Sequence, residues 1–143
     1  MKRAFPEKPL HWVGSAKDDL LDFPRKAVDD FGYALYLVQI GGKPPNAKPW
    51  KGEGSGVFEI IEDHRGNTYR AVYTVRFSEA VYVLHCFQKK SPSGIRTARI
   101  DQQRIHDRFK AATEDYEVRY WMKSGAPHLK EFEPPPRSPS RWT

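Results

Sequence analysis

Residues 57–89 read VFEIIEDHRGNTYRAVYTVRFSEAVYVLHCFQK, and this stretch decides the fold. It contains three runs rich in Val, Ile, Tyr and Phe, and alternation of this kind is typical of strands that bury one face. We therefore predict strands over Val57–Glu62, Thr68–Phe77 and Ala80–Lys89. The connections of five and two residues are too short for crossovers, so the strands should form an antiparallel meander.

The middle run has two faces of different character. Its odd-numbered positions are apolar and are expected to face a core: Tyr69, Ala71, Tyr73, Val75 and Phe77. The positions between them bring arginine to the opposite face: Arg70, Val72, Thr74 and Arg76. We expect this second face to form a shallow basic saddle.

Helical patterns flank the meander on both sides. A β-prone segment at Leu10–Gly14 precedes a short helix that begins near Ser15. A second helix follows from Pro24 to Gly41-Gly42, with apolar residues at helical spacing: Val28, Phe31, Leu35 and Val38. A last helix is predicted over Ile95–Tyr116, with an apolar stripe at Ile105, Phe109, Ala112 and Tyr116, and with Arg104, Asp107, Arg108 and Lys110 away from it. This order predicts an α+β fold, in which two N-terminal helices and a C-terminal helix pack on the meander sheet.

The segment Lys43–Gly56 joins the second helix to the meander. It contains three prolines and several glycines, which predicts a loop. Loops of about 12 or more residues in small domains tend to be functional. Lys48 and Lys51 are candidates for contacts with phosphate, and Trp50 is a candidate for stacking on a base.

Length and charge limit the classes of function. The 143 residues fit one domain, which we place at residues 1–117, followed by a Pro-rich, basic and partly disordered extension at residues 118–143. The net charge is +6, and residues 86–110 alone hold seven Lys or Arg against two Asp. Such a balance is typical of proteins that bind phosphates or an acidic partner.

Cysteine content and hydropathy indicate the compartment. The single cysteine, Cys86, excludes an internal disulfide and a Cys-based zinc site, and it fits a reducing environment. No apolar stretch approaches the roughly 20 residues of a membrane span, and the opening MKRAFPEKP has no signal-peptide core. We expect a cytoplasmic protein with no membrane contact, no metal and no cofactor.

Four segments in order carry a resemblance to a known family. They are Lys48-Pro49-Trp50-Lys51-Gly52, Gly56-Val57-Phe58-Glu59-Ile60, Thr68-Tyr69-Arg70-Ala71-Val72-Tyr73 and Leu84-His85-Cys86-Phe87-Gln88-Lys89-Lys90. Together they resemble the RelE/HigB superfamily of toxins from type II toxin-antitoxin modules, in its phage-derived killer-protein branch. The resemblance covers about residues 10–116.

The resemblance implies an mRNA interferase, a small endoribonuclease that cuts mRNA on the ribosome and is neutralised by a helix-turn-helix antitoxin. In such a site the substrate 2′-hydroxyl attacks the adjacent phosphate. This reaction requires a base, cations that stabilise the phosphorane, and an acid for the leaving oxygen. By motif position, Arg70 and Lys90 are the expected phosphate stabilisers.

The chain departs from the RelE pattern at two positions. Glu59 and Ile61 stand where that pattern has two lysines, so its general base is missing. A histidine is a chemical substitute, and we predict His85 in this role, with Tyr73 as a further catalytic candidate. The predicted RNA-binding cations are Lys48, Lys51, Arg76, Lys89, Arg96 and Arg99.

Non-catalytic interpretations stay open for the same residues. Arg70 and Glu59 are also expected as a cross-strand ion pair on the sheet. His85 and Tyr73 are alternatively buried packing residues. The alternative function is a binding module of the same fold, such as a phage-derived regulator, that contacts RNA or protein without cleavage.

Overall fold

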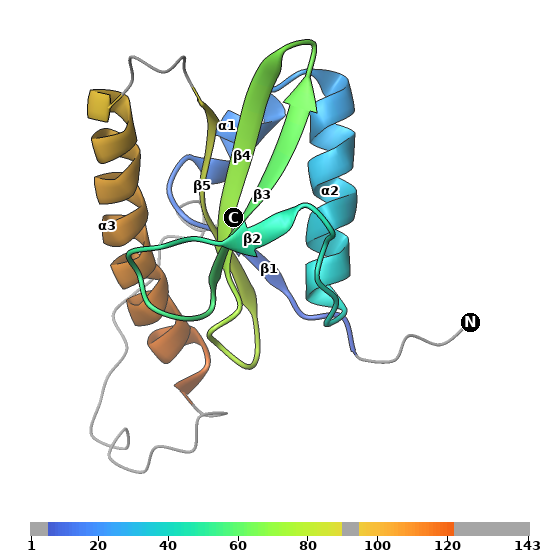
Figure 1. Cartoon of the computed structure of the whole chain (residues 1–143). Helices are drawn as coiled ribbons and strands as arrows, with labels where there is room; N and C mark the ends of the chain where they lie inside the picture. Colours follow the sequence, from blue (N-terminus) through green and yellow to red (C-terminus); the bar gives the residue numbers. More distant parts are fainter. Residues whose placement is uncertain (1–5, 90–94, 122–143) are drawn as a thin grey trace.

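The three strand-like runs form the centre of a five-stranded sheet. The computed structural model describes residues 6–89 and 95–121, except for the side chains of residues 95–98. The elements are β1 (Leu10–Trp12), α1 (Ala16–Leu21), α2 (Arg25–Gln39), β2 (Ala47–Pro49), β3 (Val57–His64), β4 (Asn67–Thr74), β5 (Val81–Lys89) and α3 (Ile95–Arg119). The predicted α+β class, with helices before and after the meander, is confirmed (Figure 1).

Two short edge strands extend the meander. The order in the sheet is β1-β5-β4-β3-β2, with β1 parallel to β5 and every other pair antiparallel. β2 lies inside Lys43–Gly56, so the prediction of a continuous loop there is wrong. The prolines of this segment argued against a strand. Pro49, however, is the last residue of β2, at the edge of the sheet, where its missing N–H costs no ladder bond. As a result, Lys48 lies opposite Glu59.

The turns at the ends of β4 differ slightly from the prediction. Arg65 and Gly66 both have positive φ, at 50° and 82°, as a tight hairpin turn requires, so β3 and β4 extend to His64 and Asn67. At the other end, the strand stops at Thr74 rather than at Phe77. The Thr74 hydroxyl donates to the Gly56 carbonyl and accepts from the backbone N–H of Arg76, so the chain turns away from the ladder.

A β-bulge interrupts the pairing of β4 with β5. Val72 pairs with His85, but Tyr73 pairs with Val83, which leaves Leu84 as the extra residue. Leu84 packs in the core beneath α3, and His85 hydrogen-bonds Asp101 of α3. The bulge therefore turns two successive side chains of β5 toward the same helix.

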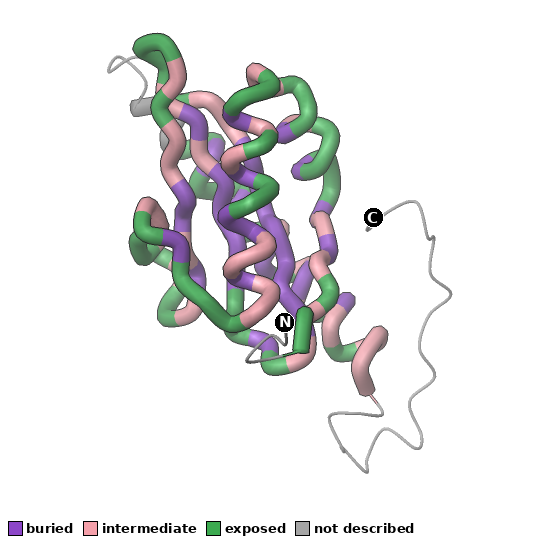
Figure 2. The backbone as a smooth tube through the Cα atoms, turned by 90° about the vertical axis from the view of Figure 1, so that its right-hand side faces the viewer, coloured by how far each residue is buried: buried purple, intermediate pink, exposed green. Residues whose placement is uncertain are grey.

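Helices cover both faces of the sheet. α1 and α2 cover one face, where Phe31, Leu35 and Val38 of the predicted stripe join the core. α3 covers part of the other face through Ile105, Phe109 and Ala112. Figure 1 shows α2 and α3 on opposite sides of the sheet, and Figure 2 shows buried backbone running through the strands between them.

The expected open saddle is therefore partly wrong. Val72 and Thr74, on the arginine-bearing face, are completely buried, because the face lies beneath α3 and its apolar stripe. Val75 and Phe77 also leave the predicted alternation, since they follow the end of β4. Phe77 packs against Tyr116 of α3 with stacked rings at 4.5 Å, on the face opposite to the one expected. What stays accessible on this face is a groove near β2.

Candidate functional site

The groove lies between the chain leaving β2 and helix α3. It has a volume of about 440 Å³ and is lined by Lys48, Pro49, Trp50, Lys51, Glu59 and Gln102. The Trp50 N–H donates to the Val57 carbonyl over 2.9 Å, which fixes the start of the loop on the sheet. The groove thus brings together both predicted loop lysines, the predicted stacking residue and Glu59.

An ion pair forms the floor of this region. Nη1 of Arg70 donates to Oε1 of Glu59 over 2.5 Å, so the expected cross-strand pair is confirmed. The two side chains are only 16% and 8% exposed. Nε of Arg70 is also buried, and it has no hydrogen-bond partner among the described residues. A buried donor of this kind costs about 1–3 kcal/mol unless another group satisfies it.

His85 belongs to a second polar cluster, in which His85 and Asp101 are buried and Arg108 is half-buried. Its Nε2 lies 2.9 Å from Oδ1 of Asp101, and its Nδ1 lies 3.4 Å from Nη1 of Arg108. Because a guanidinium only donates, Nδ1 accepts and the ring proton is on Nε2, which donates to Asp101. Burial lowers the pKa of His85 from its ordinary value, against the opposing effect of Asp101. The imidazole is therefore held neutral between α3 and the sheet.

Arg108 completes this cluster and anchors α3. Its guanidinium also donates to the Leu84 carbonyl over 3.1 Å and to the Ser15 hydroxyl over 3.0 Å. The prediction that Arg108 lies on the charged outer side of the helix is wrong, because the half-buried guanidinium joins α3 to β5 and to the start of α1.

The cavity beside His85 is acidic. It has a volume of about 430 Å³, and its ionic lining consists of Asp19, Asp22, Asp101 and Arg104, together with His85. Three carboxylates against one guanidinium repel a phosphate. His85 therefore lies in surroundings that do not suit an RNA backbone.

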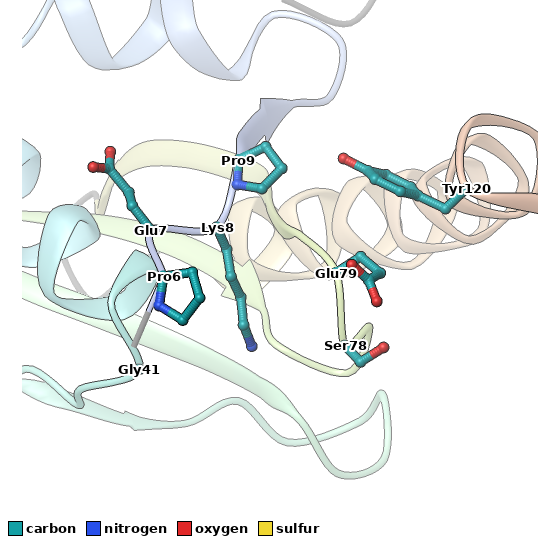
Figure 3. Close-up of a pocket in the computed structure, with 8 residues that line it drawn as sticks. All are labelled: Pro6, Glu7, Lys8, Pro9, Gly41, Ser78, Glu79 and Tyr120. Carbon is teal, nitrogen blue, oxygen red and sulfur yellow. The ribbon is translucent and has the colours of Figure 1, made fainter. Parts of the chain in front are cut away.

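A third cavity lies where the N-terminal segment meets the end of α3 (Figure 3). It has a volume of about 670 Å³ and is lined by Pro6, Glu7, Lys8, Pro9, Gly41, Ser78, Glu79 and Tyr120. Its ionic side chains are two carboxylates and one ammonium, so it also lacks the positive charge that phosphate requires. Of these three cavities, the groove at Lys48 and Lys51 is the best candidate for a phosphate-bearing ligand.

The remaining predicted site residues are spread over the molecule. Tyr73 is 2% exposed, stacks on Phe58 and faces α2, the side opposite to Arg70. Burial raises its pKa to about 12. Arg76 donates to the carbonyls of Glu53 and Ser55, and its guanidinium lies over the Phe109 ring. Tyr73 is therefore a core packing residue, and Arg76 holds the loop at Glu53–Ser55.

Four further cations were expected near RNA. Lys89 is exposed at the end of β5, and Arg99 is exposed on α3. Lys90 lies outside the described residues, as does the side chain of Arg96.

Sequence reasoning missed Gln102, Asp101 and His106. They lie on a helix whose register against the sheet is set by tertiary packing, so their sequence pattern reads as an ordinary solvated face. The only local signal was the spacing of His106 four residues after Gln102, which puts both on one face of α3.

Neither metal clusters nor membrane spans appear among residues 6–89 and 95–121. No group of three or more His, Cys, Asp or Glu side chains there is arranged to hold a metal ion. In the same residues, no helix combines the length and the apolar character that a bilayer crossing requires.

Comparisons with known proteins identify a family. Neither the curated proteins nor the solved structures gave a match to this chain. A family model described as "Phage derived protein Gp49-like (DUF891)" matches residues 18–110. The match begins in α1 and extends into α3, and it includes the groove, the Arg70–Glu59 pair and the His85 cluster. Since it spans more than half of the sequence, the chain belongs to the Gp49-like family of phage-derived proteins.

Proposed function

We propose that this Gp49-like protein is a toxin of the RelE/HigB type that cleaves mRNA on the ribosome and is neutralised by a helix-turn-helix antitoxin. The observation that carries the proposal is the Arg70 guanidinium: its buried Nε has no partner among the described residues, and its Nη1 bonds Glu59, which lines the groove of Lys48 and Lys51. A guanidinium with one donor on Glu59 retains donors for a phosphate oxygen. Together the three cations offer the charge stabilisation that a phosphorane requires.

Glu59 is the best candidate for the general base. It occupies a position where the RelE pattern has lysine, and it lines the groove. The Glu59 carboxylate accepts a hydrogen bond from Arg70 at the groove, and in this proposal it takes the proton of a 2′-hydroxyl as that oxygen attacks phosphorus. The proposal therefore moves the base from His85 to Glu59, because His85 is 2% exposed and donates to Asp101.

The rest of the groove suits a single-stranded ribonucleotide. Trp50 offers an aromatic surface for a base, a contact worth about 1–3 kcal/mol in other proteins. The Gln102 amide, on the opposite wall, both donates and accepts, as recognition of a base edge requires.

Expression in a bacterium without the antitoxin tests the toxin assignment. We expect growth arrest by the wild-type chain and relief by Arg70→Lys, which keeps a positive charge beside Glu59 but loses the forked donors. Lys90→Ala, at the position matched by the RelE/HigB resemblance, should also relieve arrest. The control is Arg25→Lys, at the exposed start of α2, which makes the same exchange at a residue that does not line the groove. Arrest by Arg70→Lys equal to wild type would contradict the site.

A second candidate function has one observation in its favour. Glu59 neutralises Arg70 inside the site, as expected if the fold retained an RNA-binding face after losing the lysines of the RelE pattern. A non-catalytic binder of this kind would block translation without producing new RNA ends.

A further inference from the structure

One exposed histidine lies on α3, one helical turn beyond the groove residue Gln102. His106 follows Gln102 by one turn of α3, so both side chains are on the same helical face. Its Nδ1 lies 3.2 Å from Oε1 of Glu53, in the loop that continues from Lys51. The His106 side chain is 61% exposed, whereas that of Glu53 is 10% exposed. An imidazole held by a largely buried carboxylate thus lies one helical turn from the groove.

This geometry differs from that of the other described histidines. His11 and His85 are buried, at 7% and 2% exposure. His64 ends β3 at the hairpin turn, five residues along the strand from Glu59, which is about 16 Å at strand rise. Among the described residues, His106 alone combines exposure, proximity to the groove and a carboxylate partner.

The contact with Glu53 prepares His106 for proton transfer. A carboxylate that accepts from Nδ1 fixes the orientation of the ring and directs Nε2 away from Glu53, toward a ligand. Histidine is the side chain most often used for proton transfer near neutral pH. This is the property that a leaving alkoxide requires of a general acid.

We propose that His106 is the general acid of the reaction and that Glu53 is its positioning residue, an inference that rests on the proposed RNA cleavage. The 2′-hydroxyl gives its proton to Glu59 while its oxygen bonds to phosphorus. The bond from phosphorus to the 5′-oxygen breaks, and that oxygen takes the Nε2 proton of His106. The products are a 2′,3′-cyclic phosphate and a 5′-hydroxyl, and one proton has moved from His106 to Glu59.

Charged groups from two sides surround His106. Glu53 faces it from the loop, and Arg76, after β4, donates to the backbone carbonyl of Glu53. Asp107 and Lys110 lie beside it on α3. A general acid must carry its proton, so cleavage by the wild type should fall at alkaline pH, and His106→Gln should lose this fall. Glu53→Gln should slow cleavage of the natural linkage, since Nδ1 of His106 loses the carboxylate that orients the ring.

A substrate with an altered leaving group isolates the acid. Ribosomes are programmed with an mRNA that contains either the natural linkage or a linkage with sulfur in place of the 5′-oxygen, in the codon of the A site. A thiolate leaves without protonation, so it removes the need for a general acid. On the natural linkage, His106→Gln should be slower than the wild type by a factor of at least about 100. On the sulfur linkage, it should cleave at nearly the wild-type rate. Glu59→Gln should be slow on both.

The outcomes separate this inference from the proposed function. His64→Gln is the matched control and should behave like the wild type on both substrates. Equal losses on both linkages for His106→Gln, or no loss on the natural one, would overturn the role of His106 while leaving cleavage intact. A wild-type protein that cuts neither linkage would overturn RNA cleavage itself. His106 is exposed, so its replacement leaves the core unchanged.

Discussion

At the scale of single residues, the Arg70–Glu59 pair is the centre of the proposed reaction. An isolated carboxylate on this face would repel a phosphate, but the adjacent guanidinium cancels its charge over 2.5 Å. Breaking a buried pair by removing one partner costs about 3–5 kcal/mol, because the other charge stays buried. Informative variants therefore keep a hydrogen-bonding group at both positions.

Glu59→Gln is expected to separate binding from cleavage. The amide oxygen still accepts from Arg70, but it is not a base, so cleavage should fall by at least about 100-fold. RNA affinity should rise, since a negative charge leaves the groove. Cleavage of ribosome-bound mRNA and binding of a single-stranded RNA oligonucleotide measure the two effects. Asp63→Asn, at the exposed end of the same strand, is the control and should change neither.

At the scale of elements, α3 is held on the sheet by polar contacts as well as by its apolar stripe. Asp101 and Arg108 both bond His85, and Arg108 reaches the Leu84 carbonyl freed by the bulge. These contacts fix the register of α3, and with it the positions of Gln102 and His106 along the groove. The contacts of His85 with Asp101 and Arg108 thus affect the groove indirectly, because they hold α3 in place on the sheet.

Asp101→Ala should therefore destabilise the fold. The Nε2 proton of His85 loses its acceptor in a buried place, and the expected loss is about 1–3 kcal/mol in the free energy of unfolding. Asp101→Asn keeps an acceptor oxygen and should lose less. Denaturant unfolding measures both, and equal stability of wild type and Asp101→Ala would show that α3 is held by apolar packing alone.

The same cluster predicts a pH dependence of stability. Burial lowers the folded-state pKa of His85 below the unfolded value of about 6.5, so the unfolded chain binds the proton first. Stability is then complete above about pH 6.5 and falls as the pH drops below it, by up to about 1.4 kcal/mol per pH unit. His85→Gln, which still donates to Asp101, should lack this contribution. Unfolding curves at pH 7.5 and 5.5 test it; an identical drop in both proteins would refute it.

Local patterns in the sequence predicted the helices and strands, but not the contacts that these elements make with one another. The period-two run at residues 68–74 and the stripe of Phe31 and Leu35 placed β4 and α2, since local periodicity reflects a buried face. The bulge at Leu84 depends on pairing across strands, and no local pattern signals it. For the same reason the sequence pointed to His85, which the bulge buries, and missed His106, which α3 carries to the groove.

At the scale of the whole molecule, only part of the positive charge is free for RNA. Arg108, in the basic stretch 86–110, and Arg76, on the face expected to be basic, donate to backbone carbonyls instead. Lys48 and Lys51 are exposed at the groove, and Arg99 is exposed on the neighbouring helix. Binding of single-stranded RNA should therefore depend on a small, localised set of phosphate contacts.

Salt dependence of RNA binding measures that set. Each phosphate contact contributes about −0.7 to the log-log slope of affinity against salt, so Lys48→Ala and Lys51→Ala should each reduce the slope by about that amount. Lys17→Ala, exposed on α1, removes an equal charge away from the groove and should leave the slope unchanged. Equal slopes for all four proteins would place the RNA on another surface.

Cleavage of translated mRNA is the central claim, and primer extension on RNA from cells that express the protein tests it most directly. The wild-type chain should produce new 5′ ends within translated codons, and Glu59→Gln should produce none at equal protein levels. Blocking translation should abolish the ends, since the proposed substrate is mRNA on the ribosome. Growth arrest without any new RNA ends would contradict cleavage and would identify the protein as a binder.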